Sequence, residues 1–311
     1  MSPERARSVI RFQPSGAPPL ALHLSHPEQL GPRTRLAIIM HGVLRNAGEY
    51  LDEWIDWAAD ADYAVACPCF DADGWPGGHS YNLGNVFARG GGRSSRKPEP
   101  QWAFTAVEEL ADHLRVALGL RDRRFDLWGH SAGAQFVHRF PLFRPAAPVR
   151  RLIAAGAGWY TLPELDREFP YGLHHPGLGV GDREALEWTA RPLVLMRGTV
   201  DTLRDPHLRS TPEAEAQGAN RYERAARMLM AARELNPQTR WRLLDIQGAG
   251  HDHAQMARGA QESWDNLLGD PSPEGEPCAT ASPKRQQAAA STGRPRWPGH
   301  GGRRCPARAA P

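Results

Sequence analysis

Short apolar runs alternate with helical patterns along most of this chain. Residues 36–40 form a continuous apolar run of the kind expected for a strand that is covered on both faces, and residues 63–69 and 149–155 are two further expected strands. Between such runs, Val107, Leu110 and Leu114 keep the spacing of an amphipathic helix. This alternation predicts an α/β fold with a mostly parallel sheet and helices on both faces. The expected strands are residues 8–12, 20–24, 36–40, 63–69, 124–128, 149–155, 192–196 and 241–246.

Two segments interrupt the alternation. A Gly/Pro-rich loop covers roughly residues 71–100, and a small cap insert covers about 162–187. Both should leave the carboxyl edge of the sheet, where folds of this class bind ligands. We expect them to border a pocket, although each aromatic side chain could instead pack under its own loop. The candidate wall residues are Trp75, Tyr81, Trp159 and Tyr160.

A turn with small residues follows the expected strand at 124–128. Gly129-His130-Ser131-Ala132-Gly133 matches G-x-S-x-G and precedes a helix-compatible run. A tight strand-to-helix turn needs small flanking residues, and it holds the serine hydroxyl out for attack. An ordinary strand-to-helix turn is the alternative interpretation, so the surroundings must decide between the two.

A serine hydroxyl needs an imidazole to accept its proton and a carboxylate to orient that imidazole. Asp201 follows the expected strand at 192–196, and His251 follows the last expected strand. Both come after Ser131, acid first and histidine last, which is the chain order found in one class of enzymes that carry the serine on a G-x-S-x-G turn. We therefore predict Ser131, Asp201 and His251 as catalytic residues. Their nearest rivals are Asp205, Asp252 and His253.

The negative charge of a tetrahedral intermediate needs two backbone N–H donors. Ala132 follows the serine and would supply one of them. The strand at 36–40 ends in His41-Gly42-Val43, where glycine lets the backbone come close to the serine. The N–H of Val43 is therefore the expected second donor, although His41-Gly42 read alone is also compatible with a simple strand-ending turn.

The charge of the chain is unevenly distributed. Its formal net charge is +3, but residues 270–311 hold seven basic and three acidic side chains, so residues 1–269 are nearly neutral. That balance argues against a nucleic-acid partner for the folded part. Residues 270–311 contain no Leu, Ile, Val, Phe, Tyr or Met. We expect a disordered tail there, following one domain at 1–269.

Membrane, cofactor and metal signals are weak. No run of about eighteen apolar residues exists, and the N-terminal residues have no apolar signal region, so we expect no membrane partner.

Four cysteines without a C-x-x-C spacing favour reduced thiols and a cytoplasmic location. His251 and His253 lack a nearby carboxylate–histidine set at ligand spacing. The sequence therefore predicts no metal and no cofactor.

Taken together, these motifs resemble those of the α/β-hydrolase superfamily, and they span nearly all of residues 8–268. The matching motifs are His41-Gly42, the turn at 129–133, Gly198-Thr199-Val200-Asp201 and Gly250-His251. Residues 76–82, 135–139 and 158–160 are similar to bacterial esterases and polyhydroxyalkanoate-depolymerase-like hydrolases. The resemblance implies the α/β-hydrolase fold and the roles already given to Ser131, Asp201 and His251.

The resemblance leaves the substrate open, because one such scaffold supports several hydrolytic reactions. We expect a small-molecule carboxylic ester, cleaved through an acyl-enzyme. A peptidase or thioesterase on the same fold is the alternative enzyme. A non-catalytic binding protein is the alternative from another class, and the intact order of Ser131, Asp201 and His251 argues against it.

Overall fold

An eight-stranded mixed sheet forms the centre of the computed structural model, which describes residues 5–88 and 95–268. The strand order is β1-β2-β4-β3-β5-β6-β7-β8. The pairs β1–β2 and β2–β4 are antiparallel, and every other pair is parallel. The predicted mostly parallel sheet is therefore confirmed. Its strands are β1 Arg5–Phe12, β2 Leu20–Pro27, β3 Arg35–Met40, β4 Tyr63–Cys69, β5 Phe125–His130, β6 Val149–Ala155, β7 Leu193–Gly198 and β8 Trp241–Ile246.

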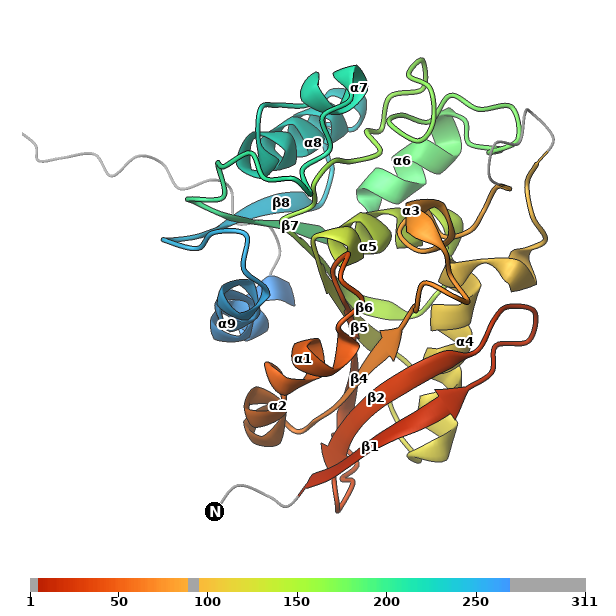
Figure 1. Cartoon of the computed structure of the whole chain (residues 1–311), viewed down its shortest axis with the longest axis vertical. Helices are drawn as coiled ribbons and strands as arrows, with labels where there is room; N and C mark the ends of the chain where they lie inside the picture. Colours follow the sequence, from red (N-terminus) through yellow and green to blue (C-terminus); the bar gives the residue numbers. More distant parts are fainter. Residues whose placement is uncertain (1–4, 89–94, 269–311) are drawn as a thin grey trace, which may run out of the picture. The chain divides into compact units, whose positions relative to one another are not determined.

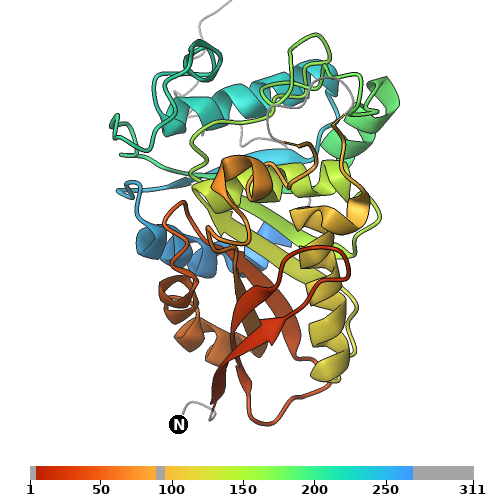
Figure 2. The same ribbon diagram turned by 45° about the vertical axis from the view of Figure 1, so that its right-hand side comes forward.

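Helices cover both faces of this sheet, as the alternating pattern predicts. In Figure 1, α1, α2 and α9 lie on one side of the sheet, and α4 and α5 lie on the other. Figure 2 shows the long α4 running beside the strands. The helices are α1 Ala47–Asp52, α2 Ile55–Ala61, α3 Gly77–Ser80, η1 Glu99–Gln101, α4 Ala103–Ala117, α5 Ala132–Phe143, α6 Asp182–Ala190, α7 Pro212–Glu215, α8 Arg221–Leu235, α9 His253–Ser263 and η2 Trp264–Leu268.

The pleat of the strands divides the apolar side chains between two cores. In β4, Ala64 and Ala66 belong to the core that contains residues of α4 and α5. Val65 and Cys67 belong to the core that contains residues of α1, α2 and α9. Because successive side chains point to opposite faces of a strand, a continuous apolar run can supply both cores. The runs in the central strands therefore need no polar alternation.

Apolar residues in the 50–58 segment keep helical spacing and predict one helix, but the structure has two helices there. The structure ends α1 at Asp52 and begins α2 at Ile55. Trp54 lies between them, is fully buried, and packs edge-on against the rings of Trp128 and Trp264 at centroid distances of 5.2 and 5.3 Å. Helical spacing predicts which side chains are buried here, but this tertiary packing decides where the helix breaks.

The two predicted loop segments contain short helices. The 71–100 segment holds α3 and η1, and the 162–187 insert overlaps the first turns of α6. No helix in the described ranges is both long and apolar enough to span a membrane. The predicted tail at 270–311 lies outside the described residues.

Candidate active site

The residues predicted for chemistry meet at the carboxyl ends of the parallel strands. Ser131 follows β5, Asp201 follows the end of β7 at Gly198, and His251 lies in the loop between β8 and α9. The neighbouring parallel strand β3 pairs with β5 and leads into Gly42. The strand order therefore brings segments that are far apart in sequence to one edge of the sheet.

Ser131 lies at the apex of a strained turn between β5 and α5. Its φ is 56° and its ψ is −111°, a backbone region that non-glycine residues rarely adopt. The flanking positions have no room for side chains. A Cβ on Gly129 would lie 2.5 Å from the Gly133 carbonyl, and one on Gly133 would lie 2.1 Å from the Met40 carbonyl oxygen. The small residues of the motif are therefore required by packing against β3 and within the turn.

Ser131, His251 and Asp201 form a continuous hydrogen-bonded row. The Nε2 atom of His251 lies 3.0 Å from Ser131 Oγ, and its Nδ1 atom lies 2.9 Å from Asp201 Oδ2. The His251 side chain is 21% exposed, whereas that of Asp201 is 4% exposed. A buried carboxylate thus holds the inner side of an imidazole whose other nitrogen reaches a partly exposed serine. This geometry allows proton transfer from the hydroxyl to the ring.

The rivals of these residues have other contacts. Asp205 accepts two hydrogen bonds from the guanidinium of Arg221, at 2.5 and 3.1 Å. Asp252 begins α9 by accepting a hydrogen bond from the backbone N–H of Gln255 at 2.8 Å. The ring of His253 stacks on Tyr50 at 4.5 Å. Each rival therefore has a structural partner outside the row.

Arg221 connects the two aspartates that follow β7. It is the first residue of α8, and its side chain is 1% exposed. Its Nη1 atom lies 3.5 Å from Asp201 Oδ1 as well as close to Asp205. The hydrogen bonds from Arg221 are the main reason that the pKa of Asp205 falls to about 2. No local sequence pattern at the start of α8 indicates that Arg221 reaches these two aspartates, so the sequence analysis missed this contact.

His130 and Tyr50 form a buried floor under the row. The His130 ring lies 4.6 Å from the His251 ring, and its Nδ1 atom lies 3.0 Å from the Tyr50 hydroxyl. Burial, followed by the nearby His251, lowers the pKa of His130 well below its usual value. His130 is therefore a neutral ring that supports His251 without competing for a proton. Its place inside the G-x-S-x-G motif was the signal that could have identified it.

The loop after β3 is held close to Ser131. A Cβ on Gly42 would lie 2.8 Å from the Tyr50 hydroxyl and 3.9 Å from Ser131 Cβ. His41 Nε2 accepts from the backbone N–H of Phe70 at 3.1 Å, so its Nδ1 donates to the Gly42 carbonyl at 2.8 Å. Burial lowers the pKa of His41 to about 4, which keeps this pair of bonds intact near neutral pH.

The two predicted oxyanion donors lie in suitable places. Ala132 is the first residue of α5, where backbone N–H groups have no partner within the helix. Val43 follows Gly42 in the loop beside Ser131, and its side chain is exposed. Their assignment as donors to a substrate oxygen stays a prediction.

Two of the predicted wall residues are packing residues. Tyr81 is buried, and its hydroxyl donates to the His41 carbonyl at 2.8 Å. Trp75 is fully buried, and its ring packs edge-on against Phe70 at 4.9 Å. The guanidinium of Arg45 joins this region by donating to the Trp75 carbonyl at 3.3 Å. Tyr81 thus supports the loop after β3, and Trp75 packs under its own loop, which was the stated alternative.

The other two wall candidates pack beside the cap insert. Trp159 is 6% exposed, and the guanidinium groups of Arg139 and Arg209 lie over its ring at 4.4 and 5.6 Å from the centroid. Tyr160 is fully buried, and its backbone N–H donates to the Gln217 side chain at 2.8 Å. A ligand contact therefore stays a prediction for Trp159. Tyr160 is a core residue in this structure.

The described residues also bear on metal binding. Within 5–88 and 95–268, no group of three or more His, Cys, Asp or Glu side chains is arranged to hold a metal ion. The charged side chains in and beside the row are Asp201, Asp205 and Arg221.

Comparison with known proteins identifies relatives through structure. No protein-family profile matches this chain, and no curated protein matches it either. The chain is similar to the solved structure of poly(aspartic acid) hydrolase-1 from Sphingomonas sp. KT-1, with 32% identity and a TM-score of 0.79 over 84% of this chain and 98% of that one. A poly(3-hydroxybutyrate) depolymerase from Bordetella parapertussis matches with 32% identity and a TM-score of 0.77, covering 84% of this chain and 90% of that one. An S-formylglutathione hydrolase from Agrobacterium tumefaciens, at 13% identity and a TM-score of 0.52 over 84% and 94% of the two chains, shares the fold alone.

Proposed function

This chain belongs to the α/β-hydrolase superfamily, and we propose that within it the chain is a serine hydrolase that cleaves carboxylic esters through an acyl-enzyme. Both relatives that share 32% identity with it are named as hydrolytic enzymes, so the chain itself is a hydrolase. The observation that carries the proposal is the hydrogen-bonded row of Ser131, His251 and Asp201. A non-catalytic binding protein would have no need of that row.

The first half of the proposed reaction acylates Ser131. Its Oγ atom attacks the carbonyl carbon of the ester while His251 Nε2 accepts the hydroxyl proton. Asp201, buried beside Nδ1, stabilises the imidazolium that forms. The carbonyl oxygen becomes an oxyanion that accepts hydrogen bonds from the N–H groups of Ala132 and Val43. When the carbonyl reforms, the bond to the alcohol oxygen breaks, and His251 gives that oxygen its proton.

The second half releases the acyl group with water. His251 Nε2 accepts a proton from the water molecule, whose oxygen attacks the acyl carbon. The same two N–H groups hold the second oxyanion. Its collapse breaks the bond to Ser131 Oγ, which recovers the proton from His251, and the carboxylic acid leaves. The partial exposure of His251 supports this step, since water has to reach the ring.

We favour an ester with a small or medium acyl part as the substrate. The relative from Bordetella parapertussis is named for poly(3-hydroxybutyrate), which is a polyester, and we take 3-hydroxyacyl esters as the first substrates to test. The substrate would be either a small molecule or a polymer end. A thioester remains an alternative, because its acyl carbonyl would meet the same attacking and stabilising groups.

Cleavage of an amide is the second candidate function. The relative from Sphingomonas sp. KT-1 is named for poly(aspartic acid), which is an amide polymer with acidic side chains. In this chain the exposed Arg209 lies over the rings of Trp159 and Tyr171, at 5.6 and 5.7 Å. A guanidinium in that position could pair with a substrate carboxylate.

The decisive experiment is active-site labelling. A fluorophosphonate probe should modify the purified protein at Ser131, because the probe reacts with activated serines. Ser131→Ala should abolish labelling and should lower turnover by about three or more orders of magnitude. Ser210→Ala removes an exposed serine and should label like the wild-type protein. Labelling that persists in Ser131→Ala would refute the assignment.

A substrate panel separates the candidate functions. We expect p-nitrophenyl esters and 3-hydroxybutyrate oligomers to be cleaved faster than peptide anilides or poly(aspartic acid). Faster cleavage of the amide substrates, together with labelling of Ser131, would favour the second candidate. Absence of both labelling and hydrolysis would favour the binding protein instead.

A further inference from the structure

A cavity of about 280 Å³ lies at the edge of the sheet opposite to Ser131. Its lining includes Val149 and Leu193, the first residues of β6 and β7, together with residues next to the starts of β5 and β8. The volume is close to the lower end of the range for small-molecule sites, roughly 300–1,000 Å³. Five arginines line it, namely Arg124, Arg150, Arg151, Arg240 and Arg242. We call it the arginine cavity.

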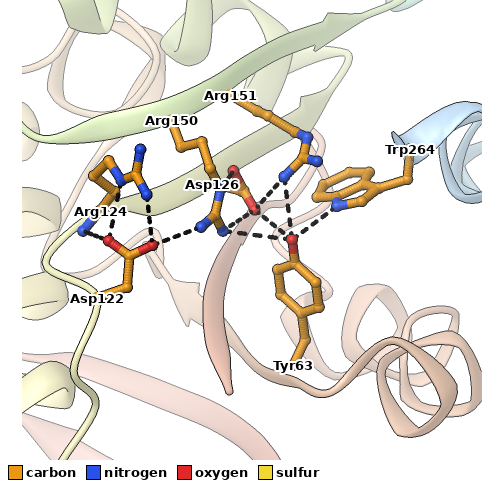
Figure 3. A network of polar contacts seen from close by, with 7 residues as sticks. All are labelled: Tyr63, Asp122, Arg124, Asp126, Arg150, Arg151 and Trp264. Atoms are coloured by element: carbon orange, nitrogen blue, oxygen red, sulfur yellow. Dashed lines mark hydrogen bonds and ion pairs between the residues drawn. The ribbon is translucent and has the colours of Figure 1, made fainter. Parts of the chain in front are cut away.

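Two aspartates neutralise part of this positive charge. Figure 3 shows Asp126 between Arg150 and Arg151, with its Oδ2 atom 2.6 and 3.1 Å from their guanidinium nitrogens. Asp122 accepts from Arg124 at 3.1 Å and from Arg150 at 3.0 Å. Three guanidinium groups thus share two carboxylates. This network leaves a positive charge on the cavity wall before Arg242 is counted.

Arg242 adds a cation without a carboxylate partner. Within the described part of the chain it forms no ion pair, and its Nη2 atom donates to the Asn266 carbonyl at 2.9 Å. Burial lowers the pKa of its guanidinium, as expected where a charge is partly removed from water. A guanidinium carries five N–H donors, so Arg242 keeps donors for a further acceptor.

A buried donor at the same cavity also has no partner. The Arg151 side chain is 2% exposed, and its Nε atom forms no hydrogen bond in the described structure. Buried polar atoms in folded proteins almost always have a partner, and an exception calls for water, an ion or a ligand. The charge of Arg242 without a carboxylate partner and the unpaired donor of Arg151 both indicate that the described protein groups do not fully satisfy this arginine cluster.

We propose that the arginine cavity binds a small anion with two or more negative charges, of the phosphate or polycarboxylate class. Guanidinium groups match the oxygen geometry of both classes with paired N–H donors. Arg242 supplies the free donors, and Asp122 and Asp126 hold the guanidinium groups of Arg124, Arg150 and Arg151 in place. A monovalent anion would leave part of the charge uncompensated, so divalent and trivalent anions should bind more tightly.

This site is separate from the row at Ser131. The cavity lies at the amino ends of β6 and β7, whereas Ser131, Asp201 and His251 follow the carboxyl ends of β5, β7 and β8. A strand of six residues spans roughly 20 Å. The inference therefore does not depend on the proposed hydrolase reaction, and the anion is not its substrate.

Isothermal titration calorimetry on the full-length protein tests the proposal. Inorganic pyrophosphate and citrate serve as separate probes for the phosphate and polycarboxylate classes, with sodium chloride at matched ionic strength as the reference. We expect one probe to bind with a stoichiometry of one, and the tighter of the two identifies the class. Arg242→Ala should weaken that binding by about tenfold or more, since a charge-assisted hydrogen bond is lost.

Three further variants make the test specific. Arg242→Gln keeps the first two methylene groups and a polar end without the charge, and it should lose binding as Arg242→Ala does, even if Arg242→Ala folds poorly. Arg183→Ala removes an arginine from the exposed face of α6, and Ser131→Ala removes the serine of the row; both should bind like the wild-type protein. Absence of saturable binding by either probe, or binding that Arg242→Gln leaves unchanged, would overturn the proposal.

Discussion

The two aspartates that follow β7 differ in what they contact. Asp201 meets His251 Nδ1, while Asp205 is held by Arg221, which also lies at the limit of hydrogen-bond distance from Asp201. Asp205 is therefore connected to the His251 imidazole only through Arg221 and Asp201. It acts on the row only through the position of Arg221.

Exchanging each aspartate for asparagine should separate these roles. Asp201→Asn should lower kcat by about 10⁴-fold, because an amide can stabilise the wrong tautomer of His251 and cannot balance an imidazolium charge. Asp205→Asn should lower kcat by about tenfold or less. Steady-state kinetics with an ester substrate measures both. A larger loss in Asp205→Asn than in Asp201→Asn would move the acid role to Asp205.

The floor under the row offers a second test at this scale. Tyr50→Phe removes the hydroxyl that meets His130 Nδ1 and lies beside Gly42. An unpaired ring nitrogen and a looser loop should then lower kcat by about three- to tenfold, with a loss of about 1–3 kcal/mol in the free energy of unfolding. Tyr222→Phe is the matched control, since its hydroxyl lies 3.4 Å from Asp245 at an exposed site. Equal effects of the two variants on kcat would argue against a role for the floor.

At the scale of elements, the contact between α5 and β3 sets the turn that carries Ser131. Gly133 approaches the last carbonyl of β3 so closely that a methyl group would lie 2.1 Å from the Met40 oxygen. The helix and the strand cannot both keep their places if that methyl group is present. The first turn of α5 and the site at its start therefore require a residue without a side chain at position 133.

Gly133→Ala should destabilise the protein and disturb the site together. We expect a loss of about 1–3 kcal/mol in the free energy of unfolding, as for other overpacked contacts, with a parallel loss of fluorophosphonate labelling. Urea denaturation measures the first quantity. Gly31→Ala is the control, because its Cβ would meet other atoms only at 3.7 Å or more, and it should change stability by less than about 1 kcal/mol. A Gly133→Ala variant as stable as the control would contradict the packing argument.

For the described part of the molecule as a whole, three buried histidines link stability to pH. Burial lowers the pKa of His41 to about 4, and it lowers those of His130 and His138 well below the ordinary value of 6.5. The unfolded chain therefore binds more protons than the folded protein below about pH 6.5. The stabilisation is complete above that pH and is lost as the pH falls toward the folded pKa values.

The free energy of unfolding should accordingly fall between pH 7 and pH 5. Each buried histidine contributes up to about 2 kcal/mol to that fall. Urea denaturation at a series of pH values measures the slope. His207→Gln removes an exposed histidine and should leave the slope unchanged, whereas His138→Gln should reduce it. A free energy of unfolding that stays constant from pH 7 to pH 5 would contradict the neutral, buried state of these rings.

The local sequence patterns were sufficient for the layers and for the order of the site residues. Strands at 63–69, 149–155 and 241–246 match β4, β6 and β8, because the strand-forming residues and the turns that bound them are neighbours in sequence. The small residues around Ser131 predicted a tight turn for the same reason. Placing Asp201 and His251 after strands was then enough to expect them at one edge, since parallel strands end at the same edge of a sheet.

Only the tertiary structure decided which side chains meet across the chain. Arg221 contacts the two aspartates from the start of α8, and Tyr81 donates to the loop after β3. Trp54 lies between two short helices and packs against other tryptophans. The arginine cavity likewise gathers residues from the starts of separate strands. Periodicity specifies which face of an element is buried. The partner on that face depends on strand order and on the exact approach of distant elements, and no local pattern encodes either.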